Sequence, residues 1–562
     1  MKRRTLTGLG MMALSVPLML GVTQIGDCGL SQEDFVLIAS GGIDDRLNGY
    51  PWAMEQFDGD DDGTPEIYVG TVQNPLCLQY WIGANPNYPP PVRWQCRNDL
   101  WGDWQAYLLA STSPGHVYRG TYDEPNDAWG WERVFSPASW ETTGFRGARV
   151  FNDALYMLGT TITGGIVWKT TDGDTFEKAC PSDMAVGGFG VAGGLRGAQV
   201  FNGKLYVANN GICEIYCSAD PSTDPNSWDN ACSLGFIASG AGVYTEHILG
   251  TVTRADATTV VDSSLEMTPL ALAGQQVTVT SAVDPNVVQQ REIFANTDDA
   301  ILVGVPFDPI PEPNDTFEAV ATDIPENSGF WQLGVFDGHL YAGCGNHNGP
   351  ELWKSDDPAP GNWTRVIEGG YGNNLAHGFM TLREYDGYLY AGTVIYPMAA
   401  AGLRGCDILR IDADDNVELL VGNIRDPNGP NEILPLSGMS GGFDYWANVY
   451  CWYMAEHDGW FYVGTYDLAG QLLDAMSSVP VEYWPEEYLV ALEDLFGTDR
   501  LRWGGSDFWR TKDGINWVPI NLNGFGDRDN YGIRNMMSTQ WGLMVGTGNA
   551  VDGFEIRLGR KQ

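Results

Sequence analysis

The sequence predicts an all-β protein: a seven-bladed β-propeller of four-stranded antiparallel blades, with an inserted small β module and one short helical insertion. Three observations carry this prediction. A hairpin signature recurs along most of the chain, and most copies are followed by two further short strands. In addition, residues 517–536 match residues 35–54 near the beginning of the chain. A unit of four strands buries its faces against neighbouring units, and a propeller provides those neighbours.

The hairpin signature consists of an aromatic residue, an Asn-Gly or Asp-Gly turn, and a strand of the pattern apolar-Tyr-apolar. These turn dipeptides between apolar strands favour a tight hairpin, because both turn positions need a positive φ. Some copies are weaker, and two are disguised by an enlarged or altered turn. The residues that open the seven copies are Phe57, Phe151, Phe201, Phe336, Tyr385, His457 and Gln540.

A second motif lies between the outer strands. Residues 170–173 (TTDG) lead to Phe176, and residues 511–514 (TKDG) lead to Trp517. In such a turn Asp accepts hydrogen bonds from backbone amides, Gly supplies a positive φ, and the aromatic residue anchors the returning strand.

This motif resembles the Asp-box (BNR-like) repeat of sialidase-type propellers, S-x-D-x-G-x-T-W. The whole repeat resembles bacterial secreted β-propeller proteins, over most of the chain after about residue 33. The resemblance implies a scaffold and not an activity. Sialidases use an arginine cluster, a tyrosine–glutamate pair and an acid–base aspartate. That set is not placed residue by residue on this chain, so the activity is not carried over.

Closure of the ring is predicted from one internal match. Residues 517–536 (WVPINLNGFGDRDNYGIRNM) align with residues 35–54 (FVLIASGGIDDRLNGYPWAM). Residues 35–40 are therefore expected to form the outer strand of the last blade, which would join the two ends of the chain in one sheet and leave no open edge.

The interruptions of the repeat define the expected domains. Residues 250–320 contain β-branched strands without the signature and predict a separate β module. In the last insertion, Pro485 opens an amphipathic pattern that predicts a helix. The expected order is a signal peptide at 1–27, blades 1–3 at 33–249 with a loop-rich insertion at 72–110, the module at 250–320, and blades 4–7 at 321–562 with the partly helical insertion at 466–505.

The N-terminus and the charge indicate the compartment. Lys2, Arg3 and Arg4 precede an apolar run, which is the layout of a secretory signal peptide. We expect a secreted, periplasmic or cell-surface protein, with a lipid anchor at Cys28 as the alternative and no integral membrane segment after signal removal. The net charge of -41 argues against nucleic acid as a partner.

Ten cysteines in an exported chain predict disulfides before metal ligands. Cys77 and Cys96 bracket the first insertion and would staple it. Cys213 and Cys232 fall on consecutive predicted strands joined by a turn and would bridge a hairpin. Connectivity does not follow from the sequence, so both pairings are hypotheses.

An acidic turn is the candidate metal site. Asp58, Asp60 and Asp62 alternate before Gly63, and Glu66 follows, so their oxygens could converge on Ca²⁺. The position of the last EF-hand ligand is occupied by Val69. The alternative is a solvated acidic hairpin turn in an acidic protein.

Arginines on the strands before the hairpin turns are the candidate ligand-binding residues, because those strands would line the central channel. Arg146 and Arg196 are expected at equal positions of the repeat, as are Arg149 and Arg534. Guanidinium groups bind carboxylates bidentately, so several together would form an anion site. The alternative is that each arginine pairs with an acidic residue and ties one blade to the next.

Aromatic residues in the first insertion suggest a third surface. Such side chains on long loops stack on sugar rings, although they also cap hydrophobic edges. They are Trp81, Tyr88, Trp94, Trp101 and Trp104.

Together these features favour a non-enzymatic, exported binding or surface-interaction module, stabilised by calcium, with a glycan or a surface protein as partner. The alternatives are a carbohydrate-active hydrolase or lyase with its site at the channel mouth, and a structural component of a cell-surface or adhesion assembly.

Overall fold

The computed structural model describes most of the chain between residues 29 and 561. The predicted signal peptide, Cys28, the predicted helix after Pro485 and most of the first-insertion aromatics lie outside the described residues. The described residues are 29–73, 75–77, 91–94, 96, 114–138, 141–161, 164–182, 184, 194–211, 213–232, 234–265, 267, 272, 275–296, 299–346, 348–395, 404–476 and 504–561.

The repeats form antiparallel four-stranded meanders. In the N-terminal part these are β2 (Asn48–Phe57), β3 (Glu66–Gln73), β4 (Val117–Asp123) and β5 (Ala128–Phe135); β6 (Gly144–Phe151), β7 (Ala154–Thr160), β8 (Gly165–Thr170) and β9 (Glu177–Lys178); and β10 (Leu195–Phe201), β11 (Lys204–Asn209), β12 (Glu214–Ser218) and β13 (Asp229–Cys232).

The C-terminal part repeats this arrangement. Its meanders are β21 (Asn327–Phe336), β22 (His339–Asn346), β23 (Glu351–Ser355) and β24 (Thr364–Ile367); β25 (Ala376–Tyr385), β26 (Tyr388–Ile395), β27 (Ile408–Ile411) and β28 (Val417–Val421); β29 (Asn448–His457), β30 (Trp460–Asp467), β31 (Phe508–Thr511) and β32 (Val518–Asn521); and β33 (Gly532–Thr539), β34 (Gly542–Gly548) and β35 (Ile556–Gly559) with β1 (Phe35–Ala39).

The first two strands of each meander join through the turn that the sequence predicts. In the β10–β11 hairpin Phe201 pairs with Lys204, and the two turn residues have positive φ, 46° at Asn202 and 72° at Gly203. Asp337 and Gly338 form the same turn between β21 and β22, with φ of 44° and 70°.

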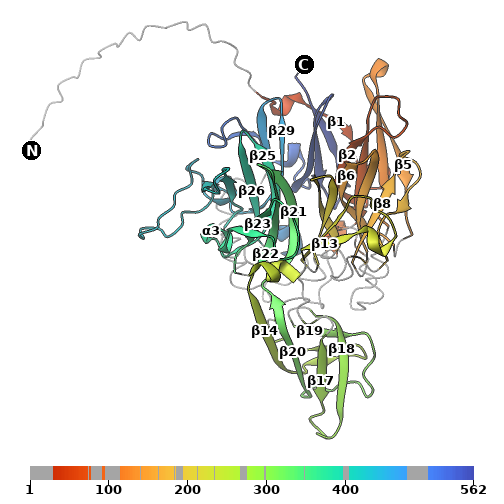
Figure 1. Cartoon of the computed structure of the whole chain (residues 1–562), viewed down its shortest axis with the longest axis vertical. Helices are drawn as coiled ribbons and strands as arrows, with labels where there is room; N and C mark the ends of the chain where they lie inside the picture. Colours follow the sequence, from red (N-terminus) through yellow and green to blue (C-terminus); the bar gives the residue numbers. More distant parts are fainter. Residues whose placement is uncertain are drawn as a thin grey trace, which may run out of the picture.

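The first strands of successive meanders contact one another around a common axis. β2 packs beside β6, β6 beside β10, β10 beside β21, β21 beside β25, β25 beside β29, β29 beside β33, and β33 returns to β2. Apolar residues of neighbouring sheets form the cores between them; Phe336 and Tyr341 of one sheet, for example, cluster with Phe379 and Leu389 of the next. The chain is therefore all-β and has a β-propeller fold (Figure 1).

The two ends of the chain share one sheet. β1 pairs antiparallel with β35, in a register that places Phe35 opposite Gly559, and β35 pairs with β34. The outermost strand of the last meander thus comes from the beginning of the chain.

An inserted β module with its own core lies between β13 and β21. It projects from the propeller on β14 and β20 (Figure 1), and a separate apolar cluster that includes Val277, Ile301 and Phe317 fills it. Its strands are β14 (Val243–Thr251), β15 (Arg254–Ala255), β16 (Thr259–Val261), β17 (Gln276–Thr280), β18 (Val288–Asn296), β19 (Ala300–Val303) and β20 (Thr316–Pro325).

Helical segments are short. α5 (Ala469–Met476) is the longest in the described residues, and none of their helices has the length and apolar character needed to span a bilayer. The others are α3 (Gly369–Gly372), α4 (Gly441–Asp444), η1 (Gln32–Asp34), η2 (Val92–Trp94), η4 (Glu124–Asn126), η6 (Pro225–Ser227), η7 (Leu234–Ser239) and η11 (Gly524–Gly526).

Cysteine pairing matches one of the two hypotheses. Cys77 and Cys96 form a disulfide, as predicted. The pairing of Cys213 with Cys232 is wrong, because both are buried free thiols. Cys232 lies opposite Ile215, and Cys213 precedes β12 with a positive φ of 51°, so the two residues are not cross-strand partners.

Candidate functional site

Every first strand of a meander carries a β-bulge at the same level of the axis. At the bulge one residue of the first strand has no partner on the second strand. A bulge of this kind changes the direction of the unpaired residue's side chain. Bulges are common next to binding sites. The unpaired residues, in order around the ring, are Trp52, Arg146, Arg196, Trp331, Met380, Trp452 and Arg534. We call these residues the bulge ring.

An axial cavity of about 80 Å³ lies at the bulge ring, with lining residues from all seven first strands. All four predicted arginines, Arg146, Arg149, Arg196 and Arg534, line it. The structure thus brings together residues that lie nearly 400 positions apart in the sequence.

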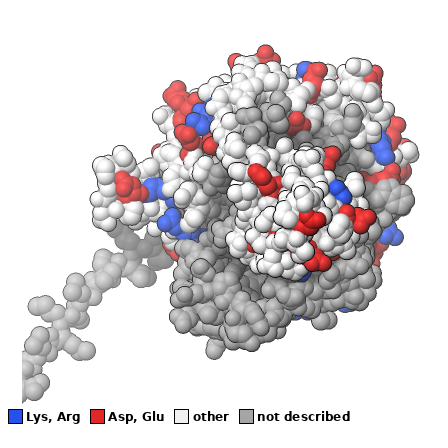
Figure 2. Space-filling view, turned by 90° about the horizontal axis from the view of Figure 1, so that it is seen from below, with Lys and Arg blue, Asp and Glu red and all other residues white. Residues whose placement is uncertain are grey.

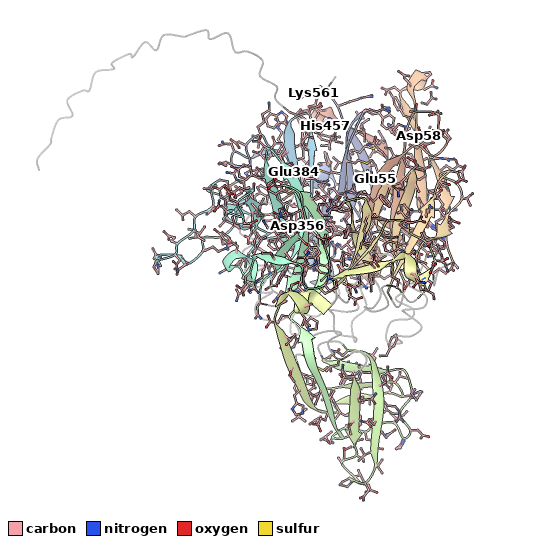
Figure 3. The ribbon with its side chains drawn as sticks, viewed as in Figure 1. Glu55, Asp58, Asp356, Glu384, His457 and Lys561 are labelled. Atoms are coloured by element: carbon pink, nitrogen blue, oxygen red, sulfur yellow. A yellow bond between two sulfur atoms is a disulfide. The ribbon has the colours of Figure 1, made fainter. Side chains whose placement is uncertain are left out.

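The cavity is closed on the side of the strand beginnings and exposed on the side of the hairpin turns. On the closed side, Tyr50, Tyr450, Tyr466 and Tyr531 belong to a buried aromatic cluster that also includes ring tryptophans. On the open side, the side chain of Glu55 is 19% exposed and that of Arg149 is 29% exposed. Figure 3 shows Glu55 among the inner strands.

Tryptophans hold the guanidinium groups of the bulge ring in place. Arg146 lies 4.7 Å from the centroid of the Trp52 ring, and Arg196 lies 4.5 Å from that of Trp331. Arg534 lies between two indoles, 5.8 Å from Trp52 and 5.4 Å from Trp452. Cation–π contacts with desolvated indoles are worth about 2 kcal/mol each, so they offset part of the cost of burying these charges.

The three ring arginines are buried cations that repel one another. Burial, followed by repulsion from Arg534, lowers the pKa of Arg146 to about 9. Burial lowers the pKa of Arg534 to about 10. The pKa of Arg196 also falls through burial, with repulsion from Arg146 and Arg534 as the next causes. Because 9 and 10 exceed neutral pH, Arg146 and Arg534 are charged there.

A second tier of polar residues lies above the bulge ring, toward the open side. Arg149 and Glu55, which lie on neighbouring sheets, form an ion pair of 3.5 Å. Arg149 also donates to Oε1 of Gln199. Burial raises the pKa of Glu55, and Arg149 opposes this effect. The alternative expectation, that arginines tie blade to blade, therefore describes Arg149 well.

One sequence alignment is wrong. Arg149 and Arg534 were expected at equal positions, but Arg534 is the bulged residue of its strand, equivalent to Arg146 and Arg196. Arg149 pairs with Tyr156 close to the hairpin turn, as Met537 pairs with Met544 in the last meander. The expected equivalence fails because it did not place the bulges.

The aromatic members of the bulge ring were not predicted. A signal for them exists, because a buried asparagine precedes the bulged residue by four positions in four strands. These pairs are Asn48 and Trp52, Asn327 and Trp331, Asn448 and Trp452, and Asn530 and Arg534.

The acidic turn has the predicted convergence in part. Carboxylate oxygens of Asp58, Asp60 and Asp62 lie within 4.8 Å of one another. Asp58 and Asp62 also accept hydrogen bonds from amides of the turn. Glu66 lies outside this set; it is buried at the start of β3 and accepts a hydrogen bond of 3.2 Å from the Gly59 amide. Calcium binding stays a prediction.

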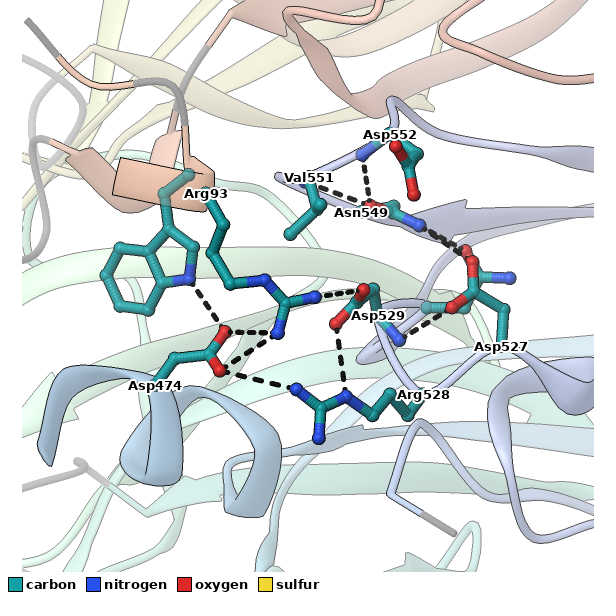
Figure 4. A network of polar contacts seen from close by, with 10 residues as sticks. Arg93, Asp474, Asp527, Arg528, Asp529, Asn549, Val551 and Asp552 are labelled. Carbon is teal, nitrogen blue, oxygen red and sulfur yellow. Dashed lines mark hydrogen bonds and ion pairs between the residues drawn. The ribbon is translucent and has the colours of Figure 1, made fainter. Parts of the chain in front are cut away.

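A polar network joins the first insertion to α5 on the closed side (Figure 4). Arg93 pairs with Asp474 at 3.0 Å and with Asp529, and Trp94 donates to Asp474 at 3.1 Å. Arg528 approaches the same two carboxylates. Since these charges satisfy one another, we interpret the network as a clamp on the closed end of the channel. Trp94 is buried in it, so this aromatic residue does not form an exposed sugar-stacking surface.

The surface carries mixed charge. Acidic side chains are spread over the described part of the face in Figure 2, with basic ones between them. The concentration of arginines at the axis is therefore a local feature of an acidic protein.

Comparisons with known proteins give only distant likenesses. No protein-family model matches the chain, and a comparison with curated proteins finds no match. The chain is similar to the solved structure of Sqt1 from Chaetomium thermophilum, at 8% identity and a TM-score of 0.34, over 91% of this chain and 95% of that one. It is also similar to the GH32 β-fructofuranosidase BmSUC1 from Bombyx mori, at 10% identity and a TM-score of 0.25, over 66% of this chain and 64% of that one. The propeller fold itself follows from the strand arrangement described above.

Proposed function

We propose that this chain is a ligand-binding β-propeller whose axial cavity takes an anionic ligand. The observation that carries this proposal is the convergence of Arg146, Arg196 and Arg534 at equivalent bulges of three strands around one cavity. Burying three like charges together costs free energy. A bound anion would reduce that cost, so the arrangement favours a ligand of opposite charge.

Binding is favoured over glycoside hydrolysis or lyase chemistry by the composition of the cavity. Hydrolysis of a glycosidic bond ordinarily needs two carboxyl groups that flank it. Among the described residues that line the cavity, Glu55 is the single one with a carboxylate, and Arg149 pairs with it. The structural alternative, an adhesion component, would use the inserted β module as its contact element.

The finer architecture is part of the same proposal. The seven four-stranded meanders would be seven blades and β1 would close the ring. The domain limits would follow the sequence-based division, except that the inserted module would extend over the whole of β14 and β20, from Val243 to Pro325. Export through the N-terminal signal is supported by the disulfide between Cys77 and Cys96, because such bonds persist in oxidising compartments.

A thermal-shift screen with neutral and anionic small molecules tests the function, on the full chain and on two variants. In Arg196→Gln, we expect stabilisation by anionic ligands to be lost. In Arg560→Gln, which removes the same charge from the exposed pair with Asp127, we expect it to be kept. The proposal fails if no ligand stabilises the protein, or if stabilisation persists in Arg196→Gln.

A further inference from the structure

We propose that the bulge ring selects a tetrahedral oxyanion of charge −2, a phosphate or sulfate group, over a monocarboxylate. This inference rests on the proposed function and names the class of its ligand. Four features of the described residues carry it: the charge of the cavity, the hydrogen-bond donors that it presents, its size and its open side.

The charge of the lining calls for more than one negative charge. Arg146, Arg196 and Arg534 form the ring tier, and Arg149 and Arg383 lie in the tier above. Glu55 is the one acidic residue of the lining and is engaged with Arg149. Five positive charges against one negative leave a surplus of four. A monoanion would neutralise one of these, whereas a dianion would neutralise two.

Two arginines of the ring, Arg534 and Arg196, lack strong acceptors in the described structure. Nε of Arg534 is buried with no hydrogen-bond partner, and this side chain is only 5% exposed. Arg196 donates to the Sδ atom of Met380 and, at 3.3 Å, to Oδ1 of Asn210. A thioether is a weak acceptor, so much of the donor capacity of Arg196 is unused.

The geometry of the ring favours a tetrahedral ligand. An indole centroid lies 4.5–5.4 Å from the guanidinium carbon of each ring arginine, so the ring tryptophans, which accept no N–H hydrogen bond, leave N–H groups to donate to a ligand. These groups come from three different strands around the axis. A planar carboxylate matches the fork of one arginine. A tetrahedral oxyanion directs its oxygens several ways from one centre and can accept from three guanidinium groups together.

The volume of the axial cavity and the position of its open side limit the size of the ligand that can enter it. A water molecule needs about 10–15 Å³ of this kind of space, so a cavity of about 80 Å³ holds a group of several heavy atoms. Pockets for whole drug-sized ligands measure about 300–1,000 Å³. The ring thus takes the charged group alone, either as a free ion or as the end of a monoester whose stem leaves past Glu55 and Arg149.

Isothermal titration calorimetry on the full chain, at constant ionic strength in a chloride buffer, tests the inference. The probes are sulfate, phosphate, acetate and glucose 6-phosphate. We expect sulfate and phosphate to bind at least tenfold more tightly than acetate. Phosphate should bind more tightly at pH 7.5 than at pH 5.5, because H2PO4− loses most of its second proton between these two pH values, whereas sulfate should change little over that range.

Variants separate the ring from general electrostatics. Arg534→Gln and Arg196→Gln should each weaken sulfate binding at least tenfold, and Arg560→Gln should leave it unchanged. Where a glutamine variant does not fold, Arg534→Lys keeps the charge but loses the planar fork, and its affinity for sulfate should fall between wild type and no binding.

The results distinguish the two proposals. Acetate binding as tightly as sulfate, with both lost in Arg196→Gln, would overturn the dianion inference and leave an axial anion site. If no anion binds, or if anion binding does not depend on Arg196, both the dianion inference and the proposed function fail. If glucose 6-phosphate binds as tightly as free phosphate, the source of the group is a monoester. If only the free ions bind, the ligand is inorganic. Both results support the dianion class.

Discussion

Buried asparagines fix the beginnings of several inner strands. Nδ2 of Asn48, Asn448 and Asn530 each donates to a glycine carbonyl six residues earlier, at 3.0, 2.9 and 3.0 Å. Their Oδ1 atoms accept from threonine hydroxyls of the adjacent strand. Each asparagine therefore holds the loop from the preceding sheet, its own strand and the next strand together, four residues before the bulge ring.

Removing one such asparagine should be costly. In Asn448→Ala the carbonyl of Gly442 and the buried carboxylate of Asp507 each lose a donor. We expect a loss of roughly 3 kcal/mol in the free energy of unfolding, because unsatisfied buried polar groups cost about 1–3 kcal/mol each. Asn416→Ala, at an exposed turn, is the control and should cost less than about 1 kcal/mol. Chemical denaturation that gives equal losses would contradict this role.

Calcium binding at the acidic turn is a separate residue-scale prediction. If Asp58, Asp60 and Asp62 share an ion, added Ca²⁺ should raise the melting temperature and EDTA should reverse the effect. The double variant Asp60→Ala, Asp62→Ala should melt at one temperature with or without calcium, whereas Asp414→Ala, in another acidic turn, should respond as wild type does. An unchanged response to calcium in the double variant would refute the site.

Residue type predicted the arginines of the site, whereas the direction of each side chain depends on strand pairing, which the sequence did not show. The arginines attracted attention because the chain has few basic residues, and all four line the cavity. Trp52, Trp331 and Trp452 were not predicted, because the asparagine four positions before each of them indicates the axial position only once the strand pairing is known. The bulges, which decide the direction of each side chain, depend on pairing with the next strand.

At the scale of elements, the Thr-x-Asp-Gly turns of residues 170–173 and 511–514 dock one sheet on the preceding one. Amides of Thr175 and Asp174 donate to the carboxylate of Asp172 and lower its pKa to about 2. Gly173 of the same turn has a φ of 73°, and a Cβ atom there would lie 1.8 Å from the hydroxyl of Tyr68 on the preceding sheet. Gly514 meets Tyr390 in the same way, at 2.2 Å.

Two glycine substitutions separate backbone strain from this docking. Gly387→Ala, at a φ of 76° in open space, should cost about 1–2 kcal/mol through the left-handed conformation alone. Gly173→Ala carries the same strain and also the clash with Tyr68, so it should cost at least about 1 kcal/mol more. Denaturation curves check the difference, and equal costs would show that the turn does not dock on Tyr68.

Elements were predicted well where a local signal determines them. The Asn-Gly and Asp-Gly hairpins form as expected because both turn residues take the positive φ that these residue types tolerate. The short helix α5 was not predicted as such. Asp467 accepts a hydrogen bond from the Ala469 amide at its start, Leu472 packs in the aromatic cluster of the closed side, and Asp474 belongs to the clamp. The predicted helix after Pro485 lies outside the described residues.

At the scale of the whole molecule, the ring depends on one strand from the beginning of the chain. Phe35 of β1 is 6% exposed and packs against Phe508 and Phe525, with ring centroids 5.5 Å apart in both cases. It thus joins the closing strand to the preceding sheet as well as to its own.

The closing strand offers a matched pair of substitutions. Phe35→Ala should lower the free energy of unfolding by about 3–5 kcal/mol, as for other buried phenylalanines. Leu37→Ala, on the same strand but 48% exposed, should cost less than about 1 kcal/mol. A small effect of Phe35→Ala in thermal and chemical denaturation would mean that β1 contributes little to closure.

The most direct test of the axial anion site is anomalous diffraction from crystals soaked in selenate, a tetrahedral dianion that carries a heavy scatterer. The account predicts a selenium peak on the axis among the guanidinium groups of Arg146, Arg196 and Arg534, and no such peak in crystals of Arg196→Gln. An empty axis in wild-type crystals that bind selenate elsewhere would contradict it.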